Sequence, residues 1–307
     1  MGAERSIAII GAGAVGGYYG ARLAQHGHDV HFLARSDYVQ LKAHGFAVGS
    51  IAGDFYLAPN QFHVYDAPTQ MPKVDLVVVA LKSTHNHHLP QILPQLLRDD
   101  TTILTLQNGL GNEQFLAEHF GAARVVGGIA FVCINRLGPG KFQHTYRGYI
   151  NFGEFSHPGR SARCEQIAQL FNDSNVKASV VEDLRAARWA KQFWNVPFNG
   201  LGALLDATTD RLLDSADGEH LVRAIMTEVL TAARADGVIL APDLPQKNID
   251  ATRSMGAYLT STHLDRRQNK PMEIEAIFGQ PVHIARRQDL HLPLLEMLYF
   301  ALRQLQK

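Results

Sequence analysis

The sequence predicts an α/β protein in which an N-terminal doubly wound sheet is followed by a C-terminal all-helical domain. In the first half, apolar runs of strand length alternate with helix-like stretches: IAII, AVGGYYGARLAQHG, VHFLA, VDLVVVAL and TTILTLQ. Continuous Val, Ile and Leu runs are typical of strands buried on both faces of a parallel sheet. In the second half, apolar residues recur at three- and four-residue steps, as in EHLVRAIMTEVLTAARADG, which indicates amphipathic helices. We therefore predict domains at residues 1–181 and 182–307.

Two further patterns complete the predicted fold. Residues 124–154 alternate more and contain Gly138-Pro139-Gly140, as expected for two antiparallel strands joined by a tight turn. Further helices are predicted from EDLRAARWAKQFWNVPFNGLGALL and PLLEMLYFALRQL.

Composition excludes several classes of protein. A chain of 307 residues with 46% hydrophobic and 19% charged residues is long enough for two cores. Because 29 basic and 29 acidic residues cancel, no global field attracts nucleic acid or an anionic membrane. We find neither a signal peptide pattern nor an apolar run long enough to span a membrane. Cys133 and Cys164 form no C-x-x-C pair, which fits a reducing compartment, so we predict a cytoplasmic protein.

The glycine pattern between the first strand and helix predicts a dinucleotide site of the Rossmann type. Gly11 allows a tight turn, Gly13 lets the backbone approach a pyrophosphate, and Gly16 lets the helix pack closely on the sheet. The motif alone leaves FAD and NAD open, as well as a glycine-rich turn with no ligand. The predicted cofactor contacts of this turn are Gly11, Gly13, Ala14, Val15 and Gly16.

The end of the second strand favours NADPH. Ala34 and Arg35 stand where an NAD-binding protein carries an acid for the ribose hydroxyls. A small residue followed by a guanidinium leaves room for a 2′-phosphate and supplies donors to it. The alternative is that Arg35 is a solvated cation and Asp37 binds the ribose.

Two polar residues follow the fourth and fifth predicted strands. Lys82 comes after VVVAL, and Asn108 comes after TLQ. Ligands of open α/β sheets bind at these carboxyl ends of strands. Asn108-Gly109 is also a common turn sequence.

A polar stripe on the first helix of the second half indicates a substrate pocket. Lys191, Asn195 and Asn199 are spaced four apart, among bulky residues such as Trp189 and Phe193. Such a stripe needs polar partners if it is buried. The alternative is a solvated helix face. Pro197 is expected to distort this helix.

Taken together, the glycine motif with Arg35, LKS, QNGLGN, RWAKQFWNVPFN and STHLDRRQNKPMEIEAIFG resemble the ketopantoate reductase (2-dehydropantoate 2-reductase) family. The resemblance extends from residue 7 to about residue 290. It implies reduction of the 2-oxo acid 2-dehydropantoate with NADPH, for pantothenate and coenzyme A synthesis.

The resemblance also implies roles for individual residues. Lys191 matches the general acid, and Glu273 matches a glutamate that contacts the substrate hydroxyl and helps to hold the lysine. A carboxylate beside Lys191 is expected to keep it protonated at neutral pH. The remaining matches are substrate residues Asn195, Asn199 and Ser261, with Lys82 and Asn108 contacting cofactor and substrate.

The assignment of Glu273 has alternatives, and the sequence departs from the family nearby. If Pro271 opens a helix, Glu273 is ordinary first-turn charge compensation, and Glu275 is the other candidate to point inward. Tyr258 stands where the family carries an asparagine, and Thr262 and His263 replace apolar residues. These changes admit a bulkier 2-oxo acid as the substrate.

The cluster His85, His87 and His88 resembles a metal site only weakly. Only His85 and His88 share a helical face, and no cysteine or carboxylate nearby completes a ligand set. We predict no metal and interpret these histidines as polar surface.

Three functional hypotheses follow. The first is an NADPH-dependent 2-oxo acid reductase, with ketopantoate as the first candidate substrate. The second is a related dehydrogenase that acts on another hydroxy acid or an amino-acid conjugate. The third is a cofactor-binding sensor without chemistry, which would not need Lys191, Glu273 and Ser261. The helical domain offers a surface for a homodimer.

Overall fold

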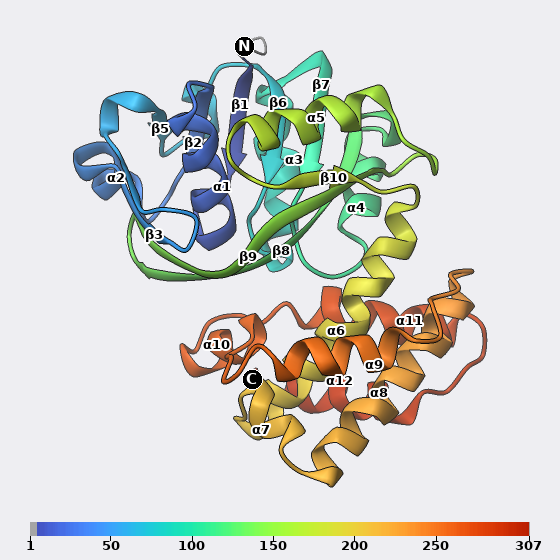
Figure 1. Ribbon diagram of the computed structural model, residues 1–307. Helices are drawn as coiled ribbons and strands as arrows, with labels where there is room; N and C mark the ends of the chain where they lie inside the picture. Colours follow the sequence, from blue (N-terminus) through green and yellow to red (C-terminus); the bar gives the residue numbers. More distant parts are fainter. Residues whose placement is uncertain (1–4, 307) are drawn as a thin grey trace. The chain divides into compact units, whose positions relative to one another are not determined.

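The computed structural model describes residues 5–306 and divides them into two compact units (Figure 1). The first unit contains the chain up to Gln107 and Asn112–Leu184. The second contains Asn108–Gly111 and the chain from Arg185 onward, so a four-residue loop joins the helical part. The ends of the two predicted domains, residues 1–4 and 307, lie outside the described residues.

The first unit is built on one sheet. Its strands are β1 (Ser6–Ile10), β2 (Asp29–Leu33), β3 (Phe46–Ser50), β4 (Phe55–Leu57), β5 (His63–Tyr65), β6 (Val74–Val79), β7 (Leu97–Thr105), β8 (Val125–Gly138), β9 (Lys141–Glu154) and β10 (Ala178–Val180). The order across the sheet is β4-β3-β9-β8-β7-β6-β1-β2-β5, and β10 pairs with β9. Strands β5, β2, β1, β6, β7 and β8 run parallel, which confirms the predicted doubly wound sheet.

Helices cover both faces of this sheet because side chains of the central strands alternate. Ile7 and Ile9 belong to the core that contains residues of α1 (Ala14–Gln25) and α5 (Ala162–Asp173). Ala8 and Ile10 belong to the opposite core, with residues of α3 (Leu89–Ile92) and α4 (Asn112–Phe120). The period of two therefore buries residues 7–10 of β1, as the continuous apolar runs predicted.

Three short strands have no counterpart among the predicted apolar runs. β3, β4 and β5 lie between VHFLA and VDLVVVAL, and with them Lys82 and Asn108 follow the sixth and seventh strands rather than the fourth and fifth. β3 pairs with the distant β9, in the register Ala47↔Lys141, and β5 pairs with β2. Strands of three to five residues that depend on distant partners carry little local signal.

The predicted antiparallel pair is confirmed by β8 and β9. They are joined by Pro139-Gly140, and Gly140 has φ 66°. Proline followed by a residue with positive φ is the pattern of a type II turn.

The second unit consists of helices around one apolar core. Its helices are α6 (Leu184–Leu205), α7 (Thr209–Leu213), α8 (Ala216–Ala235), α9 (Leu244–Arg253), α10 (Ser261–Arg267), the π-helix η6 (Glu275–Gly279), α11 (Gln280–Arg286) and α12 (Pro293–Leu305). The first unit also contains α2 (Tyr38–His44) and the short 3₁₀ helices η1 (Pro59–Gln61), η2 (Pro68–Gln70), η3 (Ser83–His88), η4 (Leu93–Gln95) and η5 (Ala122–Arg124).

Helix α6 lies in the core of the second unit. Trp189, Phe193 and Phe198 are fully buried, and the indole Nε1 of Trp189 donates a 2.8 Å hydrogen bond to Asp236 Oδ2. Pro197 does not end the helix, which continues to Leu205 although position 197 has no amide hydrogen to donate. Burial of the bulky residues supplies the stability that this missing bond removes.

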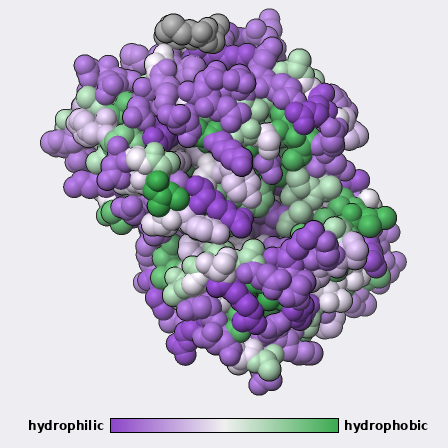
Figure 2. Space-filling view, in the orientation of Figure 1, coloured by the Kyte–Doolittle hydropathy of each residue, from purple (hydrophilic) through white to green (hydrophobic). Residues whose placement is uncertain are grey.

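Among residues 5–306 no helix is both long and apolar enough to cross a membrane. Figure 2 shows that hydrophilic residues cover most of the visible face, with apolar residues scattered between them.

Candidate active site

The glycine-rich turn after β1 has the conformation that dinucleotide binding requires. Gly11 has φ 105°, and a Cβ there would lie 2.7 Å from Leu81 N. A Cβ on Gly16 would lie 2.1 Å from Gly11 O, whereas one on Gly13 would meet nothing within 4 Å. The predicted tight turn and close helix packing are therefore confirmed. Gly13 is the N-cap of α1, and the space where its side chain would be is empty. An anion therefore has room to approach the helix N-terminus.

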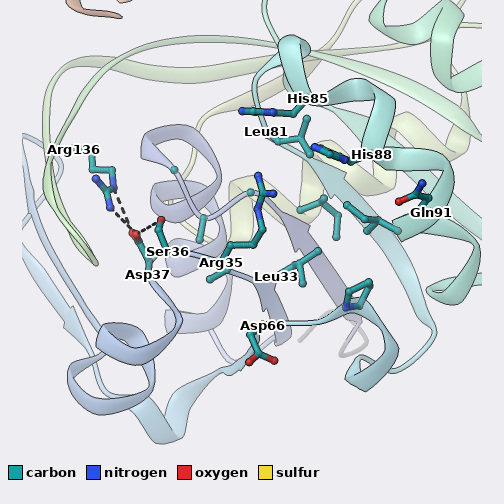
Figure 3. Close-up of a pocket in the computed structure, with 17 residues that line it drawn as sticks. Leu33, Arg35, Ser36, Asp37, Asp66, Leu81, His85, His88, Gln91 and Arg136 are labelled. Atoms are coloured by element: carbon teal, nitrogen blue, oxygen red, sulfur yellow. Dashed lines mark hydrogen bonds and ion pairs between the residues drawn. The ribbon is translucent and has the colours of Figure 1, made fainter. Parts of the chain in front are cut away.

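A cavity of about 390 Å³ extends from this turn to the end of β2 (Figure 3). Gly11, Gly13 and Arg35 line it, together with Leu81 from the end of β6. In Figure 3 the Arg35 side chain extends into the cavity toward His85. The residues fit a dinucleotide, because an open glycine at a helix N-terminus and a guanidinium lie along one cavity.

The carboxylate of Asp37, the alternative ribose ligand, forms an ion pair with another residue. It is buried, and Arg136 Nη2 from β8 lies 2.6 Å from its Oδ1. Ser36 Oγ donates a further 2.8 Å hydrogen bond to the same oxygen. The ion pair with Arg136 neutralises the carboxylate. This partner is 99 residues away, so no local pattern in the sequence indicates it.

His85 and His88 also line the cavity, so the interpretation of the cluster as polar surface is incomplete. They lie on η3, directly after Lys82, with ring centroids 6.0 Å apart. Burial, and then the neighbouring Arg35, lower the pKa of His85. A neutral imidazole at this edge adds polarity without adding charge. Lys82 itself is half-buried at the N-cap of η3.

In the second unit, Lys191 and Asn108 meet. Lys191 Nζ donates a 2.7 Å hydrogen bond to Asn108 Oδ1. The loop that carries Asn108 is held by Leu110 N, which bonds Ala276 O at 2.8 Å. Gly109 makes the close approach possible: its φ is 90°, and a Cβ would lie 2.5 Å from the Ala276 backbone. Asn108-Gly109 therefore forms a turn, and that turn places the Asn108 side chain against Lys191.

Two charged neighbours act on Lys191 in opposite directions. Burial, followed by the like charge of Arg188, lowers the pKa of Lys191 to about 7, although Glu273 raises it. The carboxylate therefore does not keep the lysine fully protonated at neutral pH, because desolvation and Arg188 outweigh it. Such a pKa suits a group that gives and regains a proton near pH 7.

Glu273 is buried and precedes the helix. Pro271 does not open a helix, since helical structure starts at Ile274, so the first-turn explanation of Glu273 is wrong. Glu275 is exposed and pairs with Tyr299 and His283 at 2.8 Å each. Of the two acids, Glu273 is thus the one whose charge acts on Lys191.

The stripe on α6 is buried, which excludes the solvated-face alternative. Asn195 and Asn199 are 5% and 2% exposed. Asn199 Oδ1 accepts hydrogen bonds from Ser261 Oγ at 3.2 Å and Thr262 N at 3.1 Å. Asn199 thereby fixes the first turn of α10 and the position of Ser261.

The three departures from the family pattern differ in burial: Thr262 and His263 are part of the packing, whereas Tyr258 is partly exposed. Thr262 and His263 are buried, and His263 Nε2 lies 2.6 Å from Asp206 Oδ1 in the packing between α6 and α10. Tyr258 is half-buried in the loop before α10, where its backbone N and O bond Thr209.

Sequence reasoning missed Arg188. It is 4% exposed and lies three positions before Lys191, on the same side of α6. The sequence did contain a signal for it, because a basic residue three positions before the predicted proton donor is expected to lie beside it on a helix.

These features define an oxidoreductase with a Rossmann-type nucleotide unit and a helical unit that carries a lysine, a glutamate and several amides. Residues 7–157 match the family described as ketopantoate reductase PanE/ApbA, and residues 183–306 match its C-terminal family. The chain belongs to this ketopantoate reductase family, whose members are NAD(P)-dependent oxidoreductases of the EC 1.1.1 class.

Individual relatives agree with this assignment over nearly the whole chain. A 2-dehydropantoate 2-reductase of Nostoc sp. is 41% identical over 98% of this chain and 95% of its own. The crystal structure of 2-dehydropantoate 2-reductase from Geobacter metallireducens GS-15 has a TM-score of 0.94 and 43% identity, covering 97% and 99% of the two chains. The structure from Methylococcus capsulatus has a TM-score of 0.87 and 32% identity, covering 98% and 96%.

Proposed function

We propose that this protein reduces 2-dehydropantoate to pantoate with NADPH, and that Lys191 gives the proton to the carbonyl oxygen. The observation that carries the proposal is the placement of Lys191, which bonds Asn108 at 2.7 Å and has a pKa of about 7 beside Glu273. A sensor of cofactor binding alone would not need a half-buried lysine with that pKa. The named relatives supply the substrate class.

NADPH, when bound, supplies a hydride to the carbonyl carbon. The developing charge on the carbonyl oxygen is stabilised by the Lys191 ammonium, which transfers one proton from Nζ as the alcohol forms. The neutral lysine then regains a proton from water, so the step leaves the protein unchanged. The hydrogen bond to Asn108 orients Nζ for this transfer.

Charge and amides in the second unit suit a 2-oxo acid. Lys191 and buried Arg188 form a cationic region that attracts a carboxylate. Ser261, fixed by Asn199, is proposed to donate to that carboxylate, and Asn195 to orient the substrate. Glu273 is proposed to accept from the substrate hydroxyl.

Selectivity for NADPH is proposed to come from Arg35 in the first unit. Its guanidinium lines the nucleotide cavity, while the nearby Asp37 is neutralised by Arg136. Arginine binds phosphate oxygens with two parallel hydrogen bonds, so a 2′-phosphate gains more from this cavity than a 2′-hydroxyl does. The proposed backbone contacts are Gly11, Gly13, Ala14, Val15 and Gly16, with Lys82 at the end of β6.

The test follows NADPH oxidation by purified protein with 2-dehydropantoate, beside a panel of bulkier 2-oxo acids. Rapid oxidation with 2-dehydropantoate that Lys191→Ala abolishes supports the proposal. If only a bulkier 2-oxo acid is turned over, that acid is the substrate, and Tyr258 is the first residue to test for the altered specificity. NADPH binding without turnover of any acid would favour the sensor.

We also propose that the protein forms a homodimer. Met297 and Phe300, one helical turn apart on α12, are 46% and 41% exposed and together offer an apolar surface to a partner. Light scattering of the wild type and of Phe300→Glu would test this, since the substitution should release monomers.

A further inference from the structure

Three potential metal ligands meet on one face of the sheet in the first unit, at the edge formed by β2 and β5. Asp29 and His31 are two positions apart on β2, so their side chains point to the same face. His63 on β5 is the direct register partner of His31. The ring centroids of the two histidines lie 4.8 Å apart, with planes inclined by 15°.

The ligand atoms of these three residues are close enough to share an ion. His31 Nε2 lies 3.0 Å from Asp29 Oδ2, and His63 Nε2 lies 3.4 Å from Asp29 Oδ1. All three ligand atoms fall within 4.8 Å of one another. Zinc bound tetrahedrally at about 2.0–2.1 Å holds its ligands roughly 3.3 Å apart, so a small rotation of exposed His63 completes the set.

Buried His31 is oriented by a second residue. Its side chain is 6% exposed, and its Nδ1 lies 3.1 Å from Tyr65 OH. A histidine ligand commonly has its other ring nitrogen held in this way. Its Nε2 is buried and faces Asp29 Oδ2 at 3.0 Å, so both potential ligand atoms already point toward one position.

The site also has an entry path. Asp29 and His63 line a cavity of about 360 Å³ between α1, β2 and η1, and His63 is 59% exposed. Water can therefore reach the fourth position of a tetrahedral ion. Two imidazoles, one carboxylate and one water are a ligand set that zinc accepts.

We propose that Asp29, His31 and His63 bind one Zn²⁺ ion, which ties the edge strand β5 to β2. This site is separate from the proton donor and from the nucleotide cavity, neither of which includes these residues. Strand β5 has only three residues, none of them buried, so a metal bridge to β2 would add to the protection of its amides.

The experiment titrates ZnCl₂ into the metal-free full-length protein by isothermal calorimetry. Wild type should bind one equivalent, and His63→Ala should weaken binding at least tenfold, because it removes an exposed ligand without disturbing the core. Asp29→Asn should weaken binding in the same way. The matched control is His87→Ala, which removes an exposed histidine from the other cluster and should bind as wild type does.

A second readout locates the ion. Zn²⁺ should raise the melting temperature of wild type and slow hydrogen exchange of the β5 amides, and His63→Ala should lose both effects. Co²⁺ should give the visible absorption of a tetrahedral site in wild type only. The proposal is overturned if wild type binds no equivalent of Zn²⁺, if binding survives His63→Ala, or if it is lost in His87→Ala.

Discussion

Lys191 Nζ is hydrogen-bonded to Asn108 Oδ1 at 2.7 Å, across 83 positions of sequence. The bond joins α6 to the Asn108–Gly111 loop, and this loop belongs to the helical unit. It also holds in place Nζ, the proposed proton donor, at the end of a flexible four-carbon side chain. Orientation of this kind is the part of catalysis that a protein scaffold supplies.

Removal of Lys191, the proposed proton donor, should abolish most of the activity. We expect Lys191→Ala to lower kcat by about 10²- to 10⁴-fold, the usual contribution of general acid catalysis. Lys191→Arg should be nearly as slow, because a guanidinium keeps the charge but does not release its proton. Steady-state kinetics would measure both. Lys247→Ala on the surface is the control, and a Lys191→Ala enzyme of normal rate would refute the assignment.

The pH dependence follows from the pKa of Lys191, which is about 7 in the folded protein. The acid acts in its protonated form, so kcat/KM should be flat below about pH 7 and fall about tenfold per unit above it. Glu273 raises the pKa of Lys191, so Glu273→Gln should move the fall to lower pH. Profiles of wild type, Glu273→Gln and exposed Glu275→Gln would be compared. A shift to higher pH in Glu273→Gln would contradict this electrostatic role.

Two glycines of the same motif should respond differently to alanine. A Cβ on Gly16 would lie 2.1 Å from Gly11 O, so Gly16→Ala should destabilise the fold by about 1–3 kcal/mol. Gly13→Ala meets nothing within 4 Å and should melt close to wild type, yet weaken NADPH binding by narrowing the approach to α1. Thermal melting and fluorescence titration would separate the effects. Equal loss of stability in both variants would contradict the prediction.

The sequence predicted those features that depend on local pattern. The continuous apolar runs of β1 and β6 and the periodicity of α6 and α8 are visible without tertiary information, because burial on both faces or on one stripe dictates them. The glycine spacing likewise predicted the conformations of Gly11 and Gly16.

Features that arise from distant pairing were not predictable in the same way. β3 exists because it adds to β9, and Arg136 reaches Asp37 only after β8 has joined the sheet. The low pKa of Lys191 depends on burial and on Arg188. From the sequence we predicted only the opposing effect of the Glu273 carboxylate. Nothing in the pattern of residues 29–63 indicated that Asp29 and His63 would meet.

Cofactor selectivity should depend on Arg35. Arg35→Ala should weaken NADPH binding by about 10- to 100-fold, the loss expected for hydrogen bonds to a charged phosphate, and leave NADH binding nearly unchanged. Dissociation constants for both nucleotides would be measured by fluorescence. Arg124→Ala, distant on η5, serves as the control. Equal weakening of NADH and NADPH would mean that Arg35 does not contact the 2′-phosphate.

Asn199 should have separable structural and electrostatic roles. Asn199→Ala removes the acceptor of Ser261 Oγ and Thr262 N, so we expect a loss of about 1–2 kcal/mol of stability, as for a lost helix cap, and a higher KM. Asn199→Asp keeps that acceptor but buries a charge and loses the donor to Asn195 Oδ1, so it should recover only part of the melting temperature. Its negative charge should still repel the substrate carboxylate, so its KM should stay high. If Asn199→Asp restores both stability and KM, the amide only holds α10 in place, and the substrate carboxylate is bound beyond its reach.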